Sequence, residues 1–117
     1  MTGDLIAEGD TRFAGNQRRP DLAYYTDEQI QQARNGKDVM PSFVLEVIST
    51  FDQINRVQRK MQDYRKANVK VVWQIFPELK EVHIYRGKQM QICEDNDICS
   101  AEEVIEGFEL SVNDLFV

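Results

Sequence analysis

The sequence predicts a mixed α/β fold in one domain that spans residues 1–117. Two short runs of branched apolar residues, at 42–48 and 69–76, have the length and composition of buried strands. Between them, apolar residues recur at helical spacing and predict a helix over 51–67. A strand–helix–strand unit of this size implies at least one parallel pair of strands. With 42% hydrophobic residues, the chain can build one modest core.

Composition and charge exclude several classes of protein. No apolar run approaches the ~20 residues of a membrane helix, and the N-terminus lacks the features of a signal peptide, so we expect a cytoplasmic protein with no membrane segment. The net charge of −6 argues against a surface that binds nucleic acid everywhere. Lys and Arg are concentrated in the first 70 residues, which is compatible with a basic surface for substrate binding on one side of the protein.

Cys93 and Cys99 stand apart from other metal ligands, which favours two free thiols over zinc or a disulfide.

The first third of the chain predicts an edge strand within 11–14, a strand over 20–25 and a helix. Pro20 suits the first position of its strand. Alternation along that strand places Asp21 on the same face as Ala23. Thr26-Asp-Glu-Gln29 has the form of a capping box, so a helix should begin there and end at Gly36.

Glu46 stands in the middle of the apolar strand 42–48. An ionised carboxylate at such a position is costly unless a cation, a metal or hydrogen bonds meet it. The simplest explanation is an ion pair with an arginine, or a strand end that reaches water. The alternative is that Glu46 belongs to a functional site.

The helix over 51–67 begins at a second capping-box pattern, Thr50-Phe-Asp-Gln53. Its apolar stripe comprises Ile54, Val57, Met61 and Tyr64. Lys60 lies on the flank of that stripe, so its stem can cover the core while its ammonium group reaches the edge of the sheet. An ordinary surface lysine is the alternative explanation.

The last half of the chain predicts three further strands and a short helix. In the strand 69–76, Val69 and Trp73 should share one face. The segments 81–86 and 89–93 predict a hairpin with a two-residue turn that begins at Gly87. His83 alternates away from its apolar neighbours and should face solvent. Ser100-Ala-Glu-Glu103 predicts a short helix, and 111–116 a last helical turn.

Three polar residues from these elements make a candidate catalytic site, namely Asp21, Glu46 and Lys60. Two carboxylates from neighbouring strands can hold one Mg²⁺ or Mn²⁺ ion, because such cations prefer oxygen ligands and retain several waters. A lysine beside them can orient an attacking water or neutralise charge on a phosphate. Such a set could hydrolyse a phosphodiester without a Cys, His or Ser nucleophile.

Several segments, in this order, resemble the Uma-two family of restriction endonucleases, a branch of the PD-(D/E)XK nuclease superfamily. The matching segments are RPDLAYY at 19–25, PSFVLEVIST at 41–50, RKMQDYRKANVKVVWQIFPELKEVHIYR at 59–86 and VIEGFELSVNDLF at 104–116. The resemblance implies a restriction-endonuclease-like mixed sheet flanked by helices. Family members usually have a further upstream region with a helix and a strand, so it also implies that this chain lacks most of that region.

The resemblance also assigns roles to individual residues. The two acidic metal ligands of the family fall on Asp21 and Glu46. The superfamily usually places its lysine two residues after the glutamate, where this chain has Ile48. The family instead has a lysine on the following helix, one turn before a tyrosine, and Lys60 with Tyr64 matches that pattern. Tyr64 is expected to serve mainly in packing.

The family resemblance implies Mg²⁺ or Mn²⁺ as cofactor, DNA as substrate and a homodimer as the assembly. A second hypothesis from a different class is a catalytically inactive nuclease-fold protein that acts as a dimerising interaction module, through the sheet edge that the missing N-terminal region would leave bare. A nuclease-fold protein that acts on RNA or on modified DNA is a third possibility.

Overall fold

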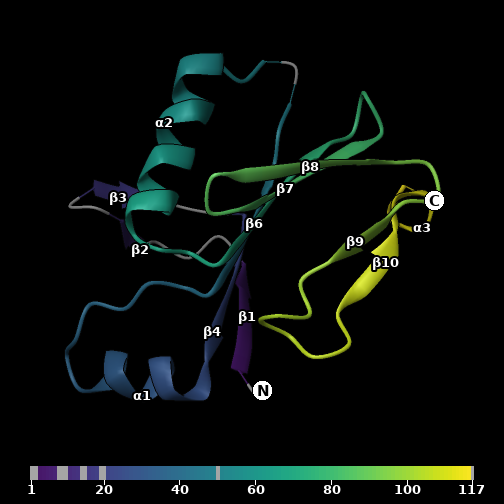
Figure 1. The fold of residues 1–117 in the computed structure, drawn as a ribbon. Coiled ribbons are helices and arrows are strands. Elements are labelled where there is room, and N and C mark those ends of the chain that lie inside the picture. The colour runs from purple at the N-terminus through teal and green to yellow at the C-terminus, as the bar shows by residue number, and fades with distance from the viewer. Residues whose placement is uncertain (1–2, 8–10, 14–15, 19–20, 50, 117) are drawn as a thin grey trace.

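A six-stranded sheet in the order β1-β4-β5-β6-β7-β8 forms the centre of this computed structural model (Figure 1). The structure describes residues 3–7, 11–13, 16–18, 21–49 and 51–116. β5 and β6 run parallel, with α2 as the crossover between them, and the other neighbouring pairs are antiparallel. The strands span Gly3–Ala7 (β1), Leu22–Thr26 (β4), Phe43–Val47 (β5), Val71–Phe76 (β6), Glu81–Arg86 (β7) and Gln89–Glu94 (β8).

Two small sheets and three helices complete the described part of the chain. β2 pairs with β3, and β9 pairs with β10. The predicted edge strand corresponds to β2, although Ala14 lies outside the described residues, as does Pro20. These elements span Thr11–Phe13 (β2), Asn16–Arg18 (β3), Asp27–Arg34 (α1), Ile54–Lys66 (α2), Ile98–Ser100 (β9), Glu109–Ser111 (β10) and Val112–Leu115 (α3). None of the described helices is long and apolar enough for a membrane crossing.

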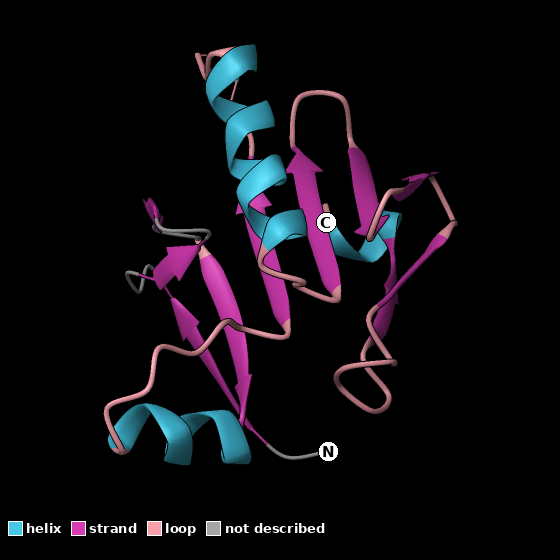
Figure 2. Ribbon diagram, turned by 60° about the vertical axis from the view of Figure 1, so that its left-hand side comes forward, coloured by secondary structure: helices cyan, strands magenta, loops and turns pink. Residues whose placement is uncertain are grey.

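The main sheet carries a separate apolar cluster on each face. On one face, Val44 and Val72 pack against Met61 and Tyr64 of α2. On the other face, the strands pack against the C-terminal segment that contains β9, β10 and α3 (Figure 2). The buried residues of this second cluster are Tyr24, Phe43, Val71, Trp73, Ile75, Val82, Ile84, Cys93, Cys99, Ala101, Val104 and Val112. The sheet is therefore a middle layer, with α2 on one side and the C-terminal segment on the other.

The prediction for Val69 was wrong. Val69 packs with the α2 cluster, whereas Trp73 lies in the cluster on the opposite face. The physical reason is that β6 begins only at Val71, so the two-residue alternation of a strand does not extend back to Val69.

The two capping-box predictions had different outcomes. At α1, Thr26 Oγ1 accepts a hydrogen bond from Gln29 N, and Gln29 Oε1 accepts one from Thr26 N, which confirms the capping box. The predicted box of α2 is wrong, because the helix begins at Ile54 and Gln53 makes no capping hydrogen bond with its side chain. Thr50 lies outside the described residues. Asp52 instead accepts a hydrogen bond from Ser49 N, in the loop before the helix.

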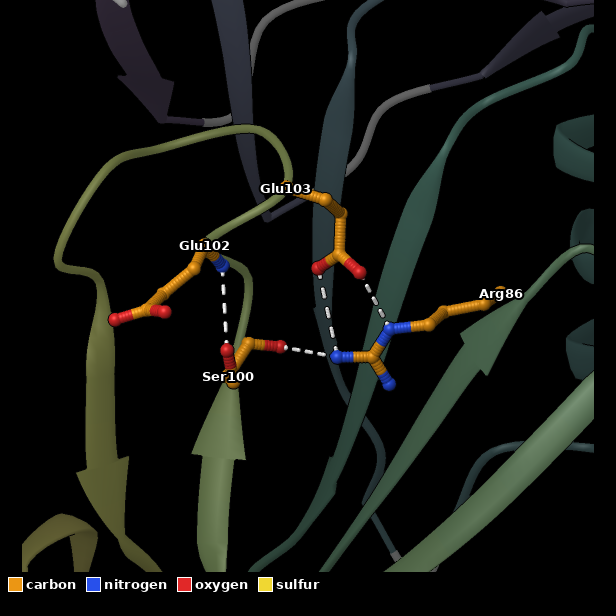
Figure 3. Close-up of polar contacts among 4 residues, drawn as sticks. All are labelled: Arg86, Ser100, Glu102 and Glu103. Atoms are coloured by element: carbon orange, nitrogen blue, oxygen red, sulfur yellow. Dashed lines mark hydrogen bonds and ion pairs between the residues drawn. The ribbon is translucent and has the colours of Figure 1, made fainter.

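The helix predicted from Ser100 is also wrong. Ser100 ends β9, and the chain returns through turns to β10. Arg86 of β7 reaches this region, where its guanidinium group donates to Glu103 Oε2 at 2.7 Å and to the Ser100 carbonyl at 2.9 Å (Figure 3). These contacts join the Ser100 carbonyl and the Glu103 side chain to β7 of the main sheet, and they favour the observed path over a helix.

Cys93 of β8 and Cys99 of β9 are free thiols, and both are buried in the cluster between the main sheet and the C-terminal segment. Burial raises the pKa of Cys99 to about 12, to which the neighbouring Cys93 also contributes. Cys99 is therefore held as a neutral thiol near neutral pH.

An aromatic cluster anchors the face that lies beneath the C-terminal segment, and it yields a stability prediction. Phe43 is fully buried, with its ring edge-on to Trp73 at a centroid distance of 5.4 Å. We expect Phe43→Ala to lower the free energy of unfolding by about 3–5 kcal/mol. Phe51→Ala is the matched control, since Phe51 is 95% exposed and its loss should cost less than about 0.5 kcal/mol. Urea denaturation measures both, and equal losses would contradict this assignment of the core.

Candidate active site

Four polar side chains lie in one row across the face of the sheet that α2 covers. Glu46 in β5 pairs with Gln74 in β6, and Gln74 pairs with His83 in β7. The register of β4 on β5, continued by one residue beyond the strand, places Asp21 opposite Glu46. Residues that are opposite one another in a ladder point to the same face. The structure therefore brings the two carboxylates of the predicted site together on one face of the sheet.

Glu46 is the buried member of this carboxylate pair, with 5% of its surface exposed. The Tyr64 hydroxyl donates a hydrogen bond to Glu46 Oε1, and Lys60 Nζ lies 3.5 Å from Glu46 Oε2. Burial raises the pKa of Glu46 above its ordinary value, and the nearby charge of Asp21 adds to that increase. Tyr64 and Lys60 act in the opposite direction without cancelling the effect of burial. A further cation at this carboxylate would favour its ionised form.

Asp21 is held by the backbone of the neighbouring strand. Its Oδ2 accepts a hydrogen bond of 2.7 Å from Val47 N, the residue directly after Glu46. Asp21 therefore lies beside β5 although it precedes the first residue of β4. Its side chain is only partly buried, which leaves this end of the pair open to a ligand.

Lys60 and Tyr64 reach Glu46 from one side of α2. They are four residues apart, so they lie on the same face of the helix, one turn from each other. Tyr64 is fully buried in the α2 cluster, in agreement with its expected packing role, and its hydroxyl also fixes Glu46. Lys60 keeps 24% of its side chain exposed, so its stem packs while its ammonium group stays near water.

These side chains line a pocket of about 160 Å³ between α2 and the ends of β4 and β5. The pocket also contains residues that sequence reasoning did not assign to the site, notably Gln74 and Asp52. Its lining residues are Asp21, Glu46, Val47, Ile48, Asp52, Arg56, Val57, Lys60, Met61, Tyr64 and Gln74. The pocket combines three carboxylates with two cationic side chains, a set that suits a ligand with both metal and phosphate groups.

Gln74 carried a signal in the sequence that could have identified it. It is the one polar residue in the strand Val71–Phe76, and it is 3% exposed. Its two-residue spacing from Val72 puts it on the α2 face, away from Trp73. A buried amide in an apolar strand needs a polar neighbour, and the nearest candidate in register was Glu46.

His83 does not face solvent as expected. Its ring packs against Phe76 at a centroid distance of 4.4 Å, and its Nε2 lies 3.0 Å from Glu81 Oε1. It is absent from the residues that line the pocket. His83 therefore continues the polar row without belonging to the candidate site.

The donor set fits a hard divalent cation of the magnesium type. Among the described residues, no group of three or more His, Cys, Asp or Glu side chains is arranged to hold a metal ion. Mg²⁺, however, is commonly bound through one or two carboxylates, with waters and phosphate oxygens as its remaining ligands. Asp21 and Glu46 would supply those two carboxylates.

The family model described as Uma2, "Putative restriction endonuclease", matches residues 5–113. No protein of curated function matches the chain. Among solved structures, one similar chain is a putative nuclease belonging to DUF820 from Anabaena variabilis. The two are 20% identical with a TM-score of 0.85, over 97% of this chain and 68% of that one. This likeness confirms the predicted fold class. The matched family model covers most of the sequence, and the chain therefore belongs to the Uma2 family, whose members are described as putative restriction endonucleases.

Proposed function

We propose that this protein is a metal-dependent endonuclease that hydrolyses phosphodiester bonds in DNA in the cytoplasm. In this proposal Asp21 and Glu46 hold Mg²⁺ or Mn²⁺, and Lys60 assists catalysis. Family membership supports the reaction class. The observation that carries the assignment of residues is the meeting of Asp21, Glu46 and Lys60 in one pocket, from three separate elements of the fold.

Each of the two carboxylates would contribute a ligand to the cation in a different way. Asp21 is partly exposed and fixed by Val47 N, so one of its oxygens is oriented by the backbone and the other is left to a ligand. Glu46 is fixed by Tyr64 and can exchange its contact with Lys60 for one with the cation. When bound, the metal would polarise a phosphoryl oxygen and make a coordinated water more acidic.

Lys60 would then act on the substrate. Its ammonium group lies 3.5 Å from Glu46 Oε2 and remains partly exposed at the pocket. A cation at this position can neutralise the charge that develops on the phosphate oxygens as water adds to phosphorus and one ester bond breaks. Arg56, one helical turn earlier and in the same pocket, offers a second positive charge to the phosphate backbone.

A nicking assay on supercoiled plasmid DNA tests the proposed activity. We expect nicking in the presence of Mg²⁺ or Mn²⁺, and a loss of about 100-fold or more in Asp21→Asn and in Glu46→Gln. Lys60→Met should lose a similar factor, because it removes the charge that faces the phosphate.

Two substitutions serve as matched controls for nicking. Lys66→Met changes an exposed lysine on the same helix, and Glu102→Gln changes an exposed carboxylate in the C-terminal segment. Both should retain wild-type activity. Full activity in Glu46→Gln would contradict the proposed site, and a folded wild-type protein that never nicks DNA would favour the inactive interaction module.

Calorimetric titration tests metal binding separately from activity. We expect Mn²⁺ to bind at millimolar concentrations or below and to raise the melting temperature of the wild-type protein. Asp21→Asn and Glu46→Gln should bind at least about tenfold more weakly, since each removes one of two charged ligands. Glu102→Gln again provides the control. Equal binding by all four proteins would show that the cation binds elsewhere.

The raised pKa of Glu46 predicts how stability depends on pH without metal. Above the ordinary value of 4.5, the unfolded chain releases this proton before the folded protein does, so Glu46 lowers the stability as the pH rises. In EDTA, Glu46→Gln should therefore be more stable than wild type at pH 8, and the difference should shrink as the pH falls toward 4.5. Urea denaturation across this range measures it. A variant that is less stable than wild type at pH 8 would contradict the direction of the shift.

A further inference from the structure

The outer edge of β8 is open. β8 is the last strand of the six-stranded sheet, and no described strand pairs with its outer side. Every residue from Lys88 to Ile92 is exposed, including the large apolar side chains of Met90 and Ile92, which are 48% and 51% exposed. Exposed edges with apolar side chains tend to pair with another strand.

The β7–β8 hairpin fixes which backbone groups of β8 point outward. Arg86 and Gln89 close the two-residue turn, so the antiparallel alternation directs Gln89, Gln91 and Cys93 toward β7. The even-numbered residues of β8 then direct their N–H and C=O groups to the open side. Glu94 follows this pattern, because its N–H donates a hydrogen bond to Asp97 Oδ2 at 3.0 Å and not to β7.

We propose that the open edge of β8 is the interface with a second copy of this chain, paired antiparallel about a two-fold axis at Gln91. In this register Met90 of each copy is opposite Ile92 of its partner. Both residues have outward backbone groups, so these pairs can form the ladder hydrogen bonds. Both also lie on the α2 face, because their partners in β7 are Tyr85 and His83. The paired edges would thus cover their own apolar side chains.

The charges at the two ends of β8 favour this same register. At one end, Lys88 lines a groove with Arg65 and Lys66 from the end of α2, so three cations gather there. At the other end, Glu94 is directly opposite Glu81 in the ladder, and Asp95 and Asp97 follow it. Antiparallel pairing about Gln91 places Glu94 of one copy opposite Lys88 of the other, at both ends of the interface.

Neighbouring registers lose this match. A shift by two residues places Met90 opposite Met90 or Ile92 opposite Ile92, and leaves Lys88 or Glu94 opposite an apolar side chain. A parallel arrangement would place like charges at the same end. Because the pairing is isologous, it uses the open β8 edge of both copies and closes at two chains.

A charge-exchange experiment tests the interface through the mass of the assembly in solution, a measurement that does not depend on nuclease activity. Sedimentation velocity over roughly 1–500 μM should show a reversible dimer of the wild-type protein. Lys88→Glu and Glu94→Lys each put like charges opposite one another at both ends, and each should weaken dimerisation about tenfold or more. An equimolar mixture of the two variants restores opposite charges at both ends, so it should form a heterodimer at close to wild-type concentrations.

Two further variants separate the interface from folding. Lys37→Glu makes the same charge change at an exposed position between α1 and β5, and it should dimerise as wild type does. Met90→Pro removes an outward N–H that β7 does not use, so it should block dimerisation while the monomer still melts cooperatively. A wild-type protein that stays monomeric throughout this range would overturn the proposal. The proposal would also be overturned if neither charge reversal nor Met90→Pro weakened the dimer. The same holds if the mixture of the two charge variants dimerised no more tightly than either variant alone.

Discussion

The buried carboxylate of Glu46 is the constraint on which the arrangement of this protein depends. A charge inside the sheet is tolerated only where other groups meet it, and here Tyr64 and Lys60 of α2 do so. Because these two residues share one side of the helix, their contacts fix the rotation of α2 over β5 and β6. The same contacts leave the pKa of Glu46 raised, so its charge is only partly compensated. The divalent cation of the proposed function would supply the remaining positive charge.

Strand register explains how residues distant in the sequence reach this point. Side chains alternate between the two faces, so an apolar cluster under the C-terminal segment and a polar row under α2 come from the same strands. Trp73 and Gln74 are adjacent in β6, yet one lies in the apolar core and the other lines the pocket. A slip of one residue would exchange these faces and bury Glu46 in the apolar cluster. The core therefore specifies the register that builds the site.

Much of this arrangement could be predicted from local patterns in the sequence. The apolar run around Glu46, the stripe of α2 and the turn at Gly87 each specify structure within a few residues, and all three elements form. The stripe of α2 is shorter than predicted, because Ile54 at the start of the helix is 77% exposed whereas Met61 and Tyr64 are buried. The wrong predictions fall where distant contacts decide the structure. The segment after Ser100 has the pattern of a capping box, but Arg86 of β7 holds it in turns. Gln74 stood out as the one polar residue of its strand, but its pairing with Glu46 depends on the register between two strands, which the local sequence does not specify.

The position of the pocket within the sheet separates the proposed catalytic site from the proposed interface. Glu46 lies on β5, and β8 lies three strands away, or roughly 14 Å at the usual spacing between strands. None of the residues that line the pocket belongs to β8 or to its turn. α2 spans the space between the two, since Lys60 faces the pocket while Arg65 and Lys66, at its far end, lie in a groove with Lys88. Two physical connections therefore join β8 to the pocket. One is this helix, which Tyr64 and Glu46 fix. The other is the row across the sheet, in which Gln74 pairs with His83 and His83 pairs with Ile92 of β8.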